Sequence, residues 1–173
     1  MIPTVLKASK SFRNVIRYVG RDDAEAQAKK RSPLTDADCG VFNMEVDCGT
    51  SEDRELIWQL MEGDAAQASH YRGNPFYHFD VSWMESEHPT REQFEQAARH
   101  CIEGLGFGNC QTFWAAHRDT DHDHMHVVAC KVMLDESGKT TCSRRTVSTA
   151  KSLWRRRCTG MCICTTTNCP SRL

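Results

Sequence analysis

Two periods of hydrophobicity alternate along the chain and divide it into strands and helices. Residues 2–7 and 40–47 have the short apolar stretches typical of strands, and between them apolar side chains recur every three or four positions, as in a helix. Ser9 or Ser11 supplies an N-cap for this first helix, which we expect to run to about Val19. The chain therefore opens as a strand, a helix and a second strand, with a polar loop before the second strand.

One tyrosine lies at the edge of the apolar face of this first helix. The face itself consists of Phe12, Val15, Ile16 and Val19. At about 100° per residue, Tyr18 lies roughly 110° from the centre of that face, which places it at the border between core and solvent. Gly20 is expected to end the helix, because glycine accepts the left-handed conformation that often follows the last turn.

The middle of the chain continues the alternation of helices and strands. Thr50 or Ser51 begins a second helix, and residues 76–84 form an aromatic and β-branched strand. Thr90 and Gln93 then make a capping box at the start of a third helix. The second helix is expected to end near residue 61 after packing its apolar side chains, which are Leu56, Ile57, Leu60 and Met61.

The last elements determine the fold class. Strands over 111–117 and 124–133 flank a short polar loop and predict an antiparallel hairpin, and a final helix is expected over about 147–157. Hairpin-paired strands with interspersed helices predict an α+β fold in which helices pack on an antiparallel sheet as a sandwich. We expect one domain over residues 1–157 and an irregular, cysteine-rich tail over residues 158–173.

Composition supports an ordinary globular protein. Of its 173 residues, 39% are apolar and 26% are charged, which suffices for a buried core. No apolar stretch reaches the roughly 20 residues needed to span a bilayer, and the first residues lack the apolar segment of a secretory signal. A soluble, cytoplasmic protein is therefore expected, and its ten cysteines are expected to be reduced thiols rather than disulfides.

Charge is distributed very unevenly behind a net value of −1. Residues 1–34 carry +5, residues 35–137 carry −14 and residues 138–173 carry +8. Basic ends of this kind are compatible with contact with a polyanion, but from charge alone solvated helix faces are the stronger interpretation. The cations expected to contact phosphates are Lys7, Lys10, Arg13, Arg17, Arg144, Arg145 and Arg155–Arg157.

A cluster of histidines on the predicted hairpin is the strongest indication of chemistry. His124 and His126 are two residues apart on a strand, so both imidazoles face the same side with Cα atoms about 6.6 Å apart. His117 ends the neighbouring strand and can reach the same point. Three histidines leave coordination positions open, as catalytic metal sites do. Asp119 is expected to accept the second ring proton of a ligand histidine.

Other interpretations of this cluster remain open at the level of spacing. The first is an exposed polar hairpin whose histidines bind nothing. The second is a zinc hydrolase, because imidazole ligands suit zinc and the bound metal generates hydroxide at neutral pH. The imidazoles alone favour zinc or manganese, since magnesium prefers oxygen ligands.

The same segment resembles the third motif of the MOB-P class of plasmid mobilisation relaxases, which belong to the HUH endonucleases. That motif has the form H-x-D-x-x-x-x-H-x-H followed by an apolar strand, and it is matched by His117, Asp119, His124 and His126. The preceding LGFGNCQTFWAAH is similar to the family's lead-in to that motif. This lead-in is matched by Leu105, Gly106, Phe107, Gln111 and His117.

Two further motifs occur in the family's order and carry their own implications. The strand YHFDVSW resembles the second motif, which implies that Ser82 lies near the DNA. SFRNVIRYV resembles the first motif, which implies that Tyr18 is the nucleophile. The resemblance therefore implies metal-dependent, site- and strand-specific nicking at an origin of transfer, through a 5′-phosphotyrosyl intermediate that later rejoins the strand. It implies Mg²⁺ or Mn²⁺ as the metal, with Zn²⁺ kept as an alternative from the imidazole donors.

The resemblance also implies partners and a cellular setting. Single-stranded DNA at an origin of transfer would be the substrate, with accessory mobilisation proteins of a relaxosome and no membrane. A plasmid-encoded protein of the bacterial cytoplasm is expected. Two departures are noted: Cys130 replaces a common Asn, and the chain stops where relatives usually continue. A hydrolytic metallonuclease and a non-catalytic DNA-binding remnant of a relaxase therefore remain alternatives.

Two roles are left open by the sequence. The base that takes the tyrosine proton is expected among His117, Glu45 and Asp47, and nothing in the sequence chooses between them. Stacking on unpaired bases is one interpretation of the aromatic side chains, although a place in the core is the stronger one. These aromatic residues are Tyr77, Trp83 and Trp114.

Overall fold

The computed structural model describes most of the chain up to residue 142. The described residues are 2–6, 11–22, 28–29, 31, 34–68, 73–134 and 140–142. Several sequence predictions lie outside these residues: the cations Lys7 and Lys10, the basic residues from Arg144 onward, the last helix over 147–157 and the tail over 158–173.

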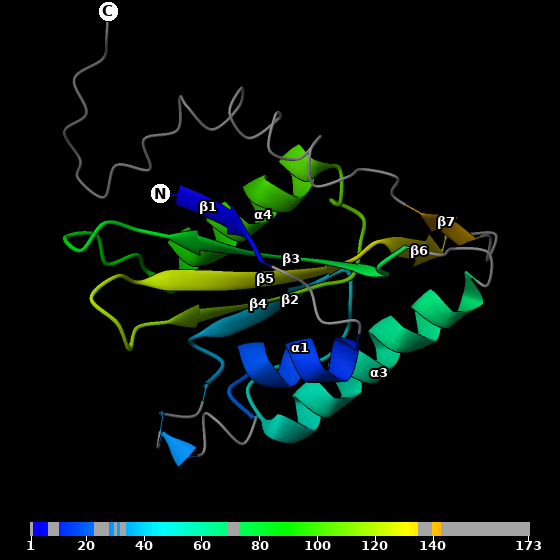
Figure 1. Cartoon of the computed structure of the whole chain (residues 1–173), viewed down its shortest axis with the longest axis horizontal. Helices are drawn as coiled ribbons and strands as arrows, with labels where there is room; N and C mark the ends of the chain where they lie inside the picture. Colours follow the sequence, from blue (N-terminus) through cyan, green and yellow to red (C-terminus); the bar gives the residue numbers. More distant parts are fainter. Residues whose placement is uncertain are drawn as a thin grey trace, which may run out of the picture.

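An antiparallel sheet forms the middle layer of the molecule (Figure 1). Its five strands lie in the order β1-β3-β5-β4-β2, and each neighbouring pair is antiparallel. The strands are β1 (Ile2–Val5), β2 (Cys39–Phe42), β3 (Phe76–Ser82), β4 (Thr112–His117) and β5 (His124–Cys130). The expected β4–β5 hairpin is confirmed, and its two strands pair at the centre of the sheet.

Helices cover both faces of this sheet (Figure 1). On one face lie α1 (Phe12–Val19) and α3 (Ser51–Gln67), and on the other lies α4 (Arg91–Leu105). Each face has its own cluster of buried apolar residues, because successive side chains of a strand point to opposite sides. The predicted α+β sandwich is therefore confirmed. No helix among the described residues is long and apolar enough to cross a membrane.

The helix starts agree with the sequence signals. Ser11 caps α1 by accepting a hydrogen bond from the Asn14 amide. Thr90 and Gln93 form the predicted capping box of α4, and Thr50 forms a second one with Asp53 at the start of α3. These caps satisfy amide groups that have no partner within the helix, so the three helix starts follow from local sequence.

The interior of α3 corrects the expected packing. Leu56 and Leu60 are 45% and 37% exposed, whereas Arg54 is buried together with Ile57 and Met61. The buried stripe passes through Arg54 because its guanidinium binds the Asp22 carboxylate at 2.6 and 2.7 Å. The helix also continues to Gln67, beyond its predicted end near Met61, since the glycine at position 63 does not interrupt it.

Three strand and turn boundaries also differ from expectation. The strand predicted over 40–47 ends at Phe42, because Asn43 adopts a φ of 58° and bonds two carbonyls with its side chain. The strand predicted over 124–133 breaks at Lys131, after which β6 (Val132–Leu134) pairs with β7 (Thr140–Cys142).

The turn after α1 is the third difference. Gly20 ends α1 in the right-handed region at φ −75°, and Arg21 takes the positive φ instead. The glycine is needed there for room, because a β-carbon at this position would lie 2.5 Å from the Arg54 side chain.

Candidate active site

One end of the sheet presents polar side chains toward α1. Alternation along β5 turns His124 and His126 to the α1 face, and alternation along β4 turns His117 to the same face. In the pairing register, His124 lies opposite His117 on one side and Ser82 on the other. The sheet itself therefore assembles residues that are far apart in the sequence.

The three histidines lie within coordination range of one ion. Their ring centroids are 5.2 Å apart for His117 and His124, 4.9 Å for His117 and His126, and 5.3 Å for His124 and His126. One ring nitrogen from each lies within 4.8 Å of the others. The predicted convergence of the histidines is therefore confirmed, and the donor set suits a divalent metal.

Backbone carbonyls, rather than Asp119, orient two of these rings. The Nε2–H of His117 donates to the Val19 carbonyl at 2.9 Å, and the Nδ1–H of His124 donates to the His122 carbonyl at 3.2 Å. A carbonyl only accepts, so each bond assigns the proton to that nitrogen and leaves the other nitrogen free to coordinate. The buried Nδ1 of His126 has no hydrogen-bond partner among the described residues, as expected for a nitrogen reserved for an ion.

Asp119 does not take the role expected for it. Its carboxylate binds Arg21 at 2.6 Å and Arg31 at 3.3 Å instead of a histidine ring. Partial burial acts against ionisation, but the Arg21 and Arg31 guanidinium groups and a backbone hydrogen bond together outweigh it and lower the pKa of Asp119. The carboxylate thus pairs with two cations, and its expected role in orienting a ligand ring stays a prediction that no contact among the described residues supports.

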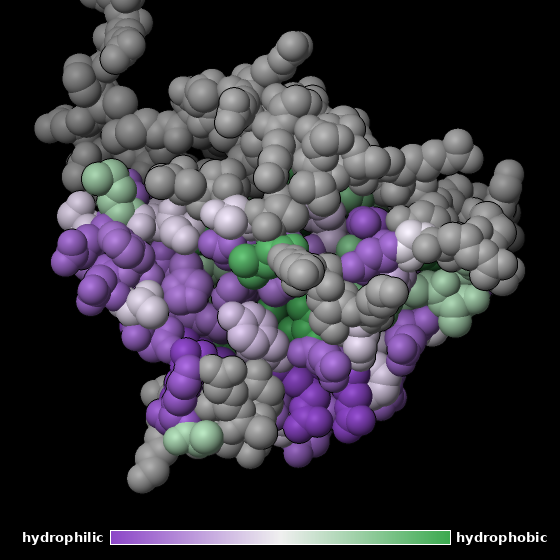
Figure 2. All heavy atoms as spheres, in the orientation of Figure 1, coloured by the Kyte–Doolittle hydropathy of each residue, from purple (hydrophilic) through white to green (hydrophobic). Residues whose placement is uncertain are grey.

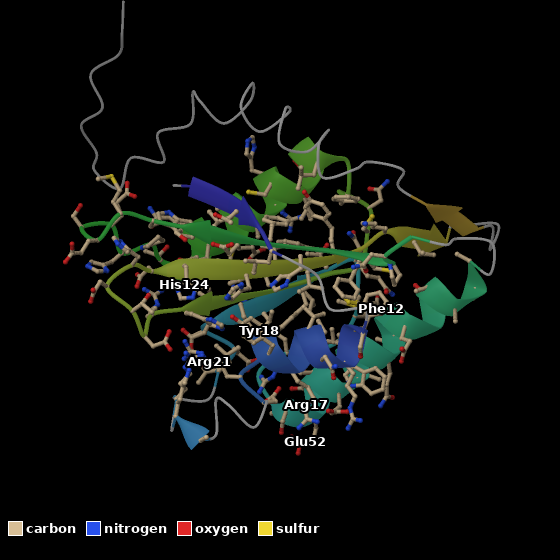
Figure 3. The ribbon with its side chains drawn as sticks, in the orientation of Figure 1. Phe12, Arg17, Tyr18, Arg21, Glu52 and His124 are labelled. Carbon is tan, nitrogen blue, oxygen red and sulfur yellow. The ribbon has the colours of Figure 1, made fainter. Side chains whose placement is uncertain are left out.

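Tyr18 lies against the triad, where the family resemblance implied that it would be. Its ring centroid is 5.6 Å from that of His126 and 6.3 Å from that of His78, and the side chain is 44% exposed. Figure 3 shows Tyr18 rising from α1 toward the strand layer that carries His124. The phenol is therefore accessible to solvent and lies next to the imidazole cluster. A phosphate bound between the phenol and the cluster would contact both.

Burial keeps most of these imidazoles neutral. Desolvation, followed by the nearby Arg21 guanidinium, lowers the pKa of His117 to about 4. Desolvation and the neighbouring His117 and His78 rings lower the pKa of His126 to about 2. Neutral imidazoles at physiological pH offer their lone pairs to a metal without first losing a proton.

Strand β3 adds two residues that sequence reasoning did not single out. His78 is 5% exposed, its ring lies 5.4 Å from that of His126, and its Nε2 has no partner among the described residues. Asp80 lies opposite His126 in the register, and burial raises its pKa. Their alternation with Phe79 and Val81 was the available signal, since polar residues recur at every second position of an otherwise apolar strand.

The basic residues near the site differ in part from those expected. Arg13 lies over the Trp58 ring at 5.8 Å, and Arg17 donates to the Asp22 carbonyl at 3.1 Å. The Arg21 guanidinium lies near enough to act on the charge of His117, and Asp119 pairs with both Arg21 and Arg31. Hydrophilic side chains gather over this end of the sheet and over α1 and α3 (Figure 2).

The other residues singled out in the sequence lie either on the triad face or away from it. Ser82 lies on the triad face and donates to Asp80 at 3.3 Å. Of the three candidate bases, only His117 lies in the cluster, whereas Asp47 lines a cavity at the β2 edge and Glu45 is exposed. Cys130 is buried in the α1–α3 core rather than at the triad. The aromatic residues Tyr77, Trp83 and Trp114 are 3%, 5% and 0% exposed, so they belong to the core and offer no stacking surface.

The comparison with protein families decides the classification. Residues 35–161 match the family model described as "Relaxase: MobA/VirD2-like, nuclease domain". The chain belongs to the MobA/VirD2-like relaxases. This confirms the resemblance to the family and the assignment of this nuclease domain to an enzyme class; the matched residues include the second and third motifs, whereas the first motif, with Tyr18, lies before them.

Individual relatives agree with this classification over shorter stretches. The relaxase domain is 36% identical over 55 residues to the protein MobA of Acidithiobacillus ferrooxidans, covering 32% of this chain and 13% of MobA. It is 33% identical over 61 residues to the protein TraI of Escherichia coli, covering 35% of this chain and 8% of TraI. The chain therefore corresponds to a small part of these relatives.

A solved structure shares the fold. It is described as the molecular basis of vancomycin resistance transfer in Staphylococcus aureus. The similarity covers 90% of this chain and 87% of the other, with a TM-score of 0.56 and 13% sequence identity. At that identity the comparison supports the arrangement of strands and helices and leaves the chemistry to the site itself.

Proposed function

We propose that this relaxase domain nicks one DNA strand at an origin of transfer by transesterification, with Tyr18 as the nucleophile. The observation that carries the proposal is the 5.6 Å separation of the Tyr18 and His126 rings, which joins the N-terminal helix to the triad. A phosphate that contacts the triad would also lie within reach of the phenol oxygen. Proximity of this kind replaces an encounter in solution with a reaction inside one complex.

The reaction conserves the phosphodiester. The Tyr18 oxygen attacks the scissile phosphorus, the bond from phosphorus to the 3′ oxygen breaks, and the 5′ phosphate remains esterified to the tyrosine. The phenol proton passes to a base, and the departing oxygen takes up a proton to become a free 3′-OH. Rejoining is the reverse attack by a 3′-OH, which needs no external energy source because the ester bond is retained.

His117, His124 and His126 would hold a divalent metal, with Nδ1 of His117 and Nε2 of His124 as donors. The metal would neutralise phosphoryl oxygens and orient the phosphate when bound. Mg²⁺ or Mn²⁺ is the proposed ion, because phosphate and water would supply oxygen ligands at the open positions. Zn²⁺ is the alternative that the imidazole donors support, and metal substitution distinguishes the three ions.

The polar pair on β3 is the proposed acceptor of the tyrosine proton. The ring of His78 lies next to that of Tyr18, and Asp80 keeps a buried oxygen, Oδ1, without a partner among the described residues. A carboxylate with a raised pKa is a better base near neutral pH than an ordinary one. Replacing each residue separately, as Asp80→Asn and His78→Gln, distinguishes a base from a residue that only positions the phenol.

Single-stranded DNA is the proposed substrate, and accessory mobilisation proteins of a relaxosome are the proposed partners in a bacterial cytoplasm. Arg21 and Arg31 lie beside the triad, where a phosphate backbone would pass. Ser82 on the same face would contact the DNA, with Arg13 and Arg17 of α1 and Lys10 before it adding electrostatic attraction. Such binding should weaken steeply with salt.

The proposal is tested by covalent capture on DNA. The protein is incubated with Mn²⁺ and single-stranded oligonucleotides spanning candidate origins of transfer, and denaturing gels reveal any protein–DNA adduct. Tyr18→Phe and a chelator should each abolish the adduct. Tyr77→Phe is the matched control, because it removes the same hydroxyl from a tyrosine buried under α4 and should leave the adduct intact.

Other outcomes select the alternative functions. Cleavage that continues in Tyr18→Phe without an adduct would indicate a hydrolytic metallonuclease in which the triad activates water. DNA binding that survives loss of the three histidines, with no cleavage by the parent protein on any cognate origin, would indicate a non-catalytic remnant.

A further inference from the structure

A second group of metal-binding side chains lies at the β2 edge of the sheet, away from the histidines. Asp36, Cys39 and Cys48 each offer one donor atom, and these atoms lie within 4.8 Å of one another. Cys39 begins β2 and Cys48 precedes α3, so the group joins two segments that the chain separates by a loop. Both cysteines are buried, and the Asp36 carboxylate lies against Gly49, directly beyond Cys48.

The two thiols form a close pair. Their sulfurs are 3.0 Å apart, with the Cys39 thiol donating to Cys48. Two guanidinium groups lie beside this pair: Arg54 donates to the Cys48 carbonyl at 2.9 Å and Arg91 donates to the Cys39 carbonyl at 3.3 Å. Thiolate is the form of cysteine that binds metals, and a neighbouring cationic environment favours it.

We propose that Asp36, Cys39 and Cys48 form a binding site for a thiophilic dication, Zn²⁺, distinct from the histidine triad. Two thiolates and a carboxylate are a donor set that zinc accepts in tetrahedral geometry. With Zn–S bonds of about 2.3 Å, the two sulfurs would lie about 3.8 Å apart, so the pair must open by less than 1 Å. Imidazole is absent from this set, which separates its chemistry from that of the triad.

The carboxylate is the reason to prefer an ion over a disulfide. The sulfurs would have to approach by about 1 Å to form a bond of about 2.05 Å, which is a movement of similar size. The disulfide, however, assigns no role to Asp36, whose carboxylate receives no hydrogen bond from the described residues. A metal uses all three groups at once.

Solvent reaches this group through a cavity of about 330 Å³. Asp36 and Cys48 line it, so a water molecule can complete four-coordination. The bound ion would tie the start of β2 to the loop before α3. Arg54 extends that link to the turn that follows α1, because it donates to the Cys48 carbonyl at 2.9 Å and binds Asp22. The bound ion would therefore stabilise the contacts between β2, the loop before α3 and the turn after α1, which is the helix that carries Tyr18.

Cobalt spectroscopy tests the site in the full chain. Co²⁺ bound by thiolate gives a near-ultraviolet charge-transfer band, whereas Co²⁺ bound by the histidine triad does not, so the triad can stay intact. The measurements use a full-length parent variant in which serine replaces the four tail cysteines, so that these thiols do not compete for the ion: Cys158, Cys162, Cys164 and Cys169. Under reducing conditions we expect a band whose final intensity corresponds to one thiolate-bound Co²⁺ per chain, besides any Co²⁺ held by the triad, and Zn²⁺ should abolish this band.

Single variants then identify the ligands. Cys39→Ser and Cys48→Ser should each abolish the band, and Asp36→Asn, a surface change that keeps the fold, should weaken Co²⁺ affinity by about 10- to 100-fold. Cys101→Ser is the matched control, because it alters a buried cysteine of α4 and should keep the band. A parent without the band, a band unchanged in Cys39→Ser and Cys48→Ser, or oxidation to a Cys39–Cys48 disulfide despite saturating Zn²⁺ would overturn the proposal. None of these results depends on DNA cleavage.

Discussion

The two faces of the sheet are built from the same strands but differ in what they bury. Under α4 the strands contribute Phe79, Val81 and Val127, and the face is apolar to its end. On the α1 face, the same strands carry apolar residues such as Phe76 and Val128 toward one end of the sheet. Toward the other end they carry His78 and His126. A strand that changes face with every residue can therefore support a complete core and a reactive surface at once.

The difference arises where the covering helix ends. Helix α4 runs along its face for 15 residues, whereas α1 has eight and stops at Val19. The carbonyl of Val19 then accepts the His117 proton instead of a further helical hydrogen bond. The end of α1 thus orients one ring of the triad and places the partly exposed Tyr18 beside it. The shortness of α1 leaves a carbonyl at its C-terminal end free to bind His117.

The largest expected effect comes from comparing substitutions at two neighbouring residues of β5, His126 on the α1 face and Val127 on the α4 face. His126→Ala should lower the rate of adduct formation by about 10³-fold, because a ligand of the proposed metal is lost. The free energy of unfolding of the metal-free protein should change by less than about 1 kcal/mol, since the lost imidazole was buried at a desolvation cost. Rates on an origin oligonucleotide and urea unfolding with a chelator measure the two quantities.

Val127→Ala is the matched change on the other face and should do the opposite. It removes buried methyl groups under α4 and should cost about 2 kcal/mol of stability while the rate stays within about twofold. If both variants lost stability equally and activity equally, the division into a structural and a reactive face would be untenable.

The next effect concerns how each helical layer is attached. Arg54→Ala breaks a buried bidentate pair with Asp22 and should destabilise the protein by about 3 kcal/mol, because the Asp22 carboxylate loses its partner. Arg99→Ala on α4 removes an exposed guanidinium near Glu95 and should cost about 0.5 kcal/mol. Chemical denaturation of both variants measures the difference, and comparable losses would contradict a polar attachment of α1 to α3.

Sequence predicted the parts of this molecule that depend on local patterns. The caps at Ser11 and Thr90 and the β4–β5 hairpin followed from residue type and spacing. The burial of Arg54 in place of Leu56 did not, because it depends on Asp22, 32 residues away in the chain. Hydrophobic periodicity reports only which side chains prefer the core, and a well-placed ion pair overrides that preference.

The site shows the same division. The triad could be predicted because β-strand geometry converts a spacing of two into a shared face. The contact of Tyr18 with that triad was implied only by family resemblance, since no local pattern connects α1 to β5. The partners of Asp119 were missed for a related reason: Arg21 and Arg31 lie in a segment whose polar sequence indicates only a loop. Long-range contacts of loops carry no periodic signal.

Acid should destabilise the α1 face selectively. The pKa values of His78 and His117 are lowered to about 4 and that of His126 to about 2, mainly by burial, so the unfolded chain binds protons below about pH 6.5 that the folded chain cannot. Stability of the metal-free protein should therefore fall as pH drops from 6.5 toward 4 and be insensitive to these groups above 7. Denaturation midpoints across that range measure the effect.

His78→Gln isolates one group of the three. It removes one buried imidazole, so the loss of stability between pH 7 and 5 should shrink by about 1 to 2 kcal/mol. The variant and parent should differ by a constant amount above pH 7, which serves as the internal control. Parallel curves over the whole range would show that His78 is not the source of the acid sensitivity.

The smallest effect concerns two glycines with different roles: Gly106 ends α4, whereas Gly63 lies inside α3 without ending it. Gly106 terminates α4 at a φ of 79°, a conformation that L side chains rarely adopt, so Gly106→Ala should cost about 1 kcal/mol or slightly more. Gly63 lies inside α3, where an added β-carbon would meet nothing within 4 Å, so Gly63→Ala should instead stabilise by about 0.5 to 1 kcal/mol. Thermal unfolding should shift in opposite directions for the two variants. A rise in the unfolding temperature of Gly106→Ala would show that the left-handed glycine cap is not needed to end α4, and that packing alone determines where this helix ends.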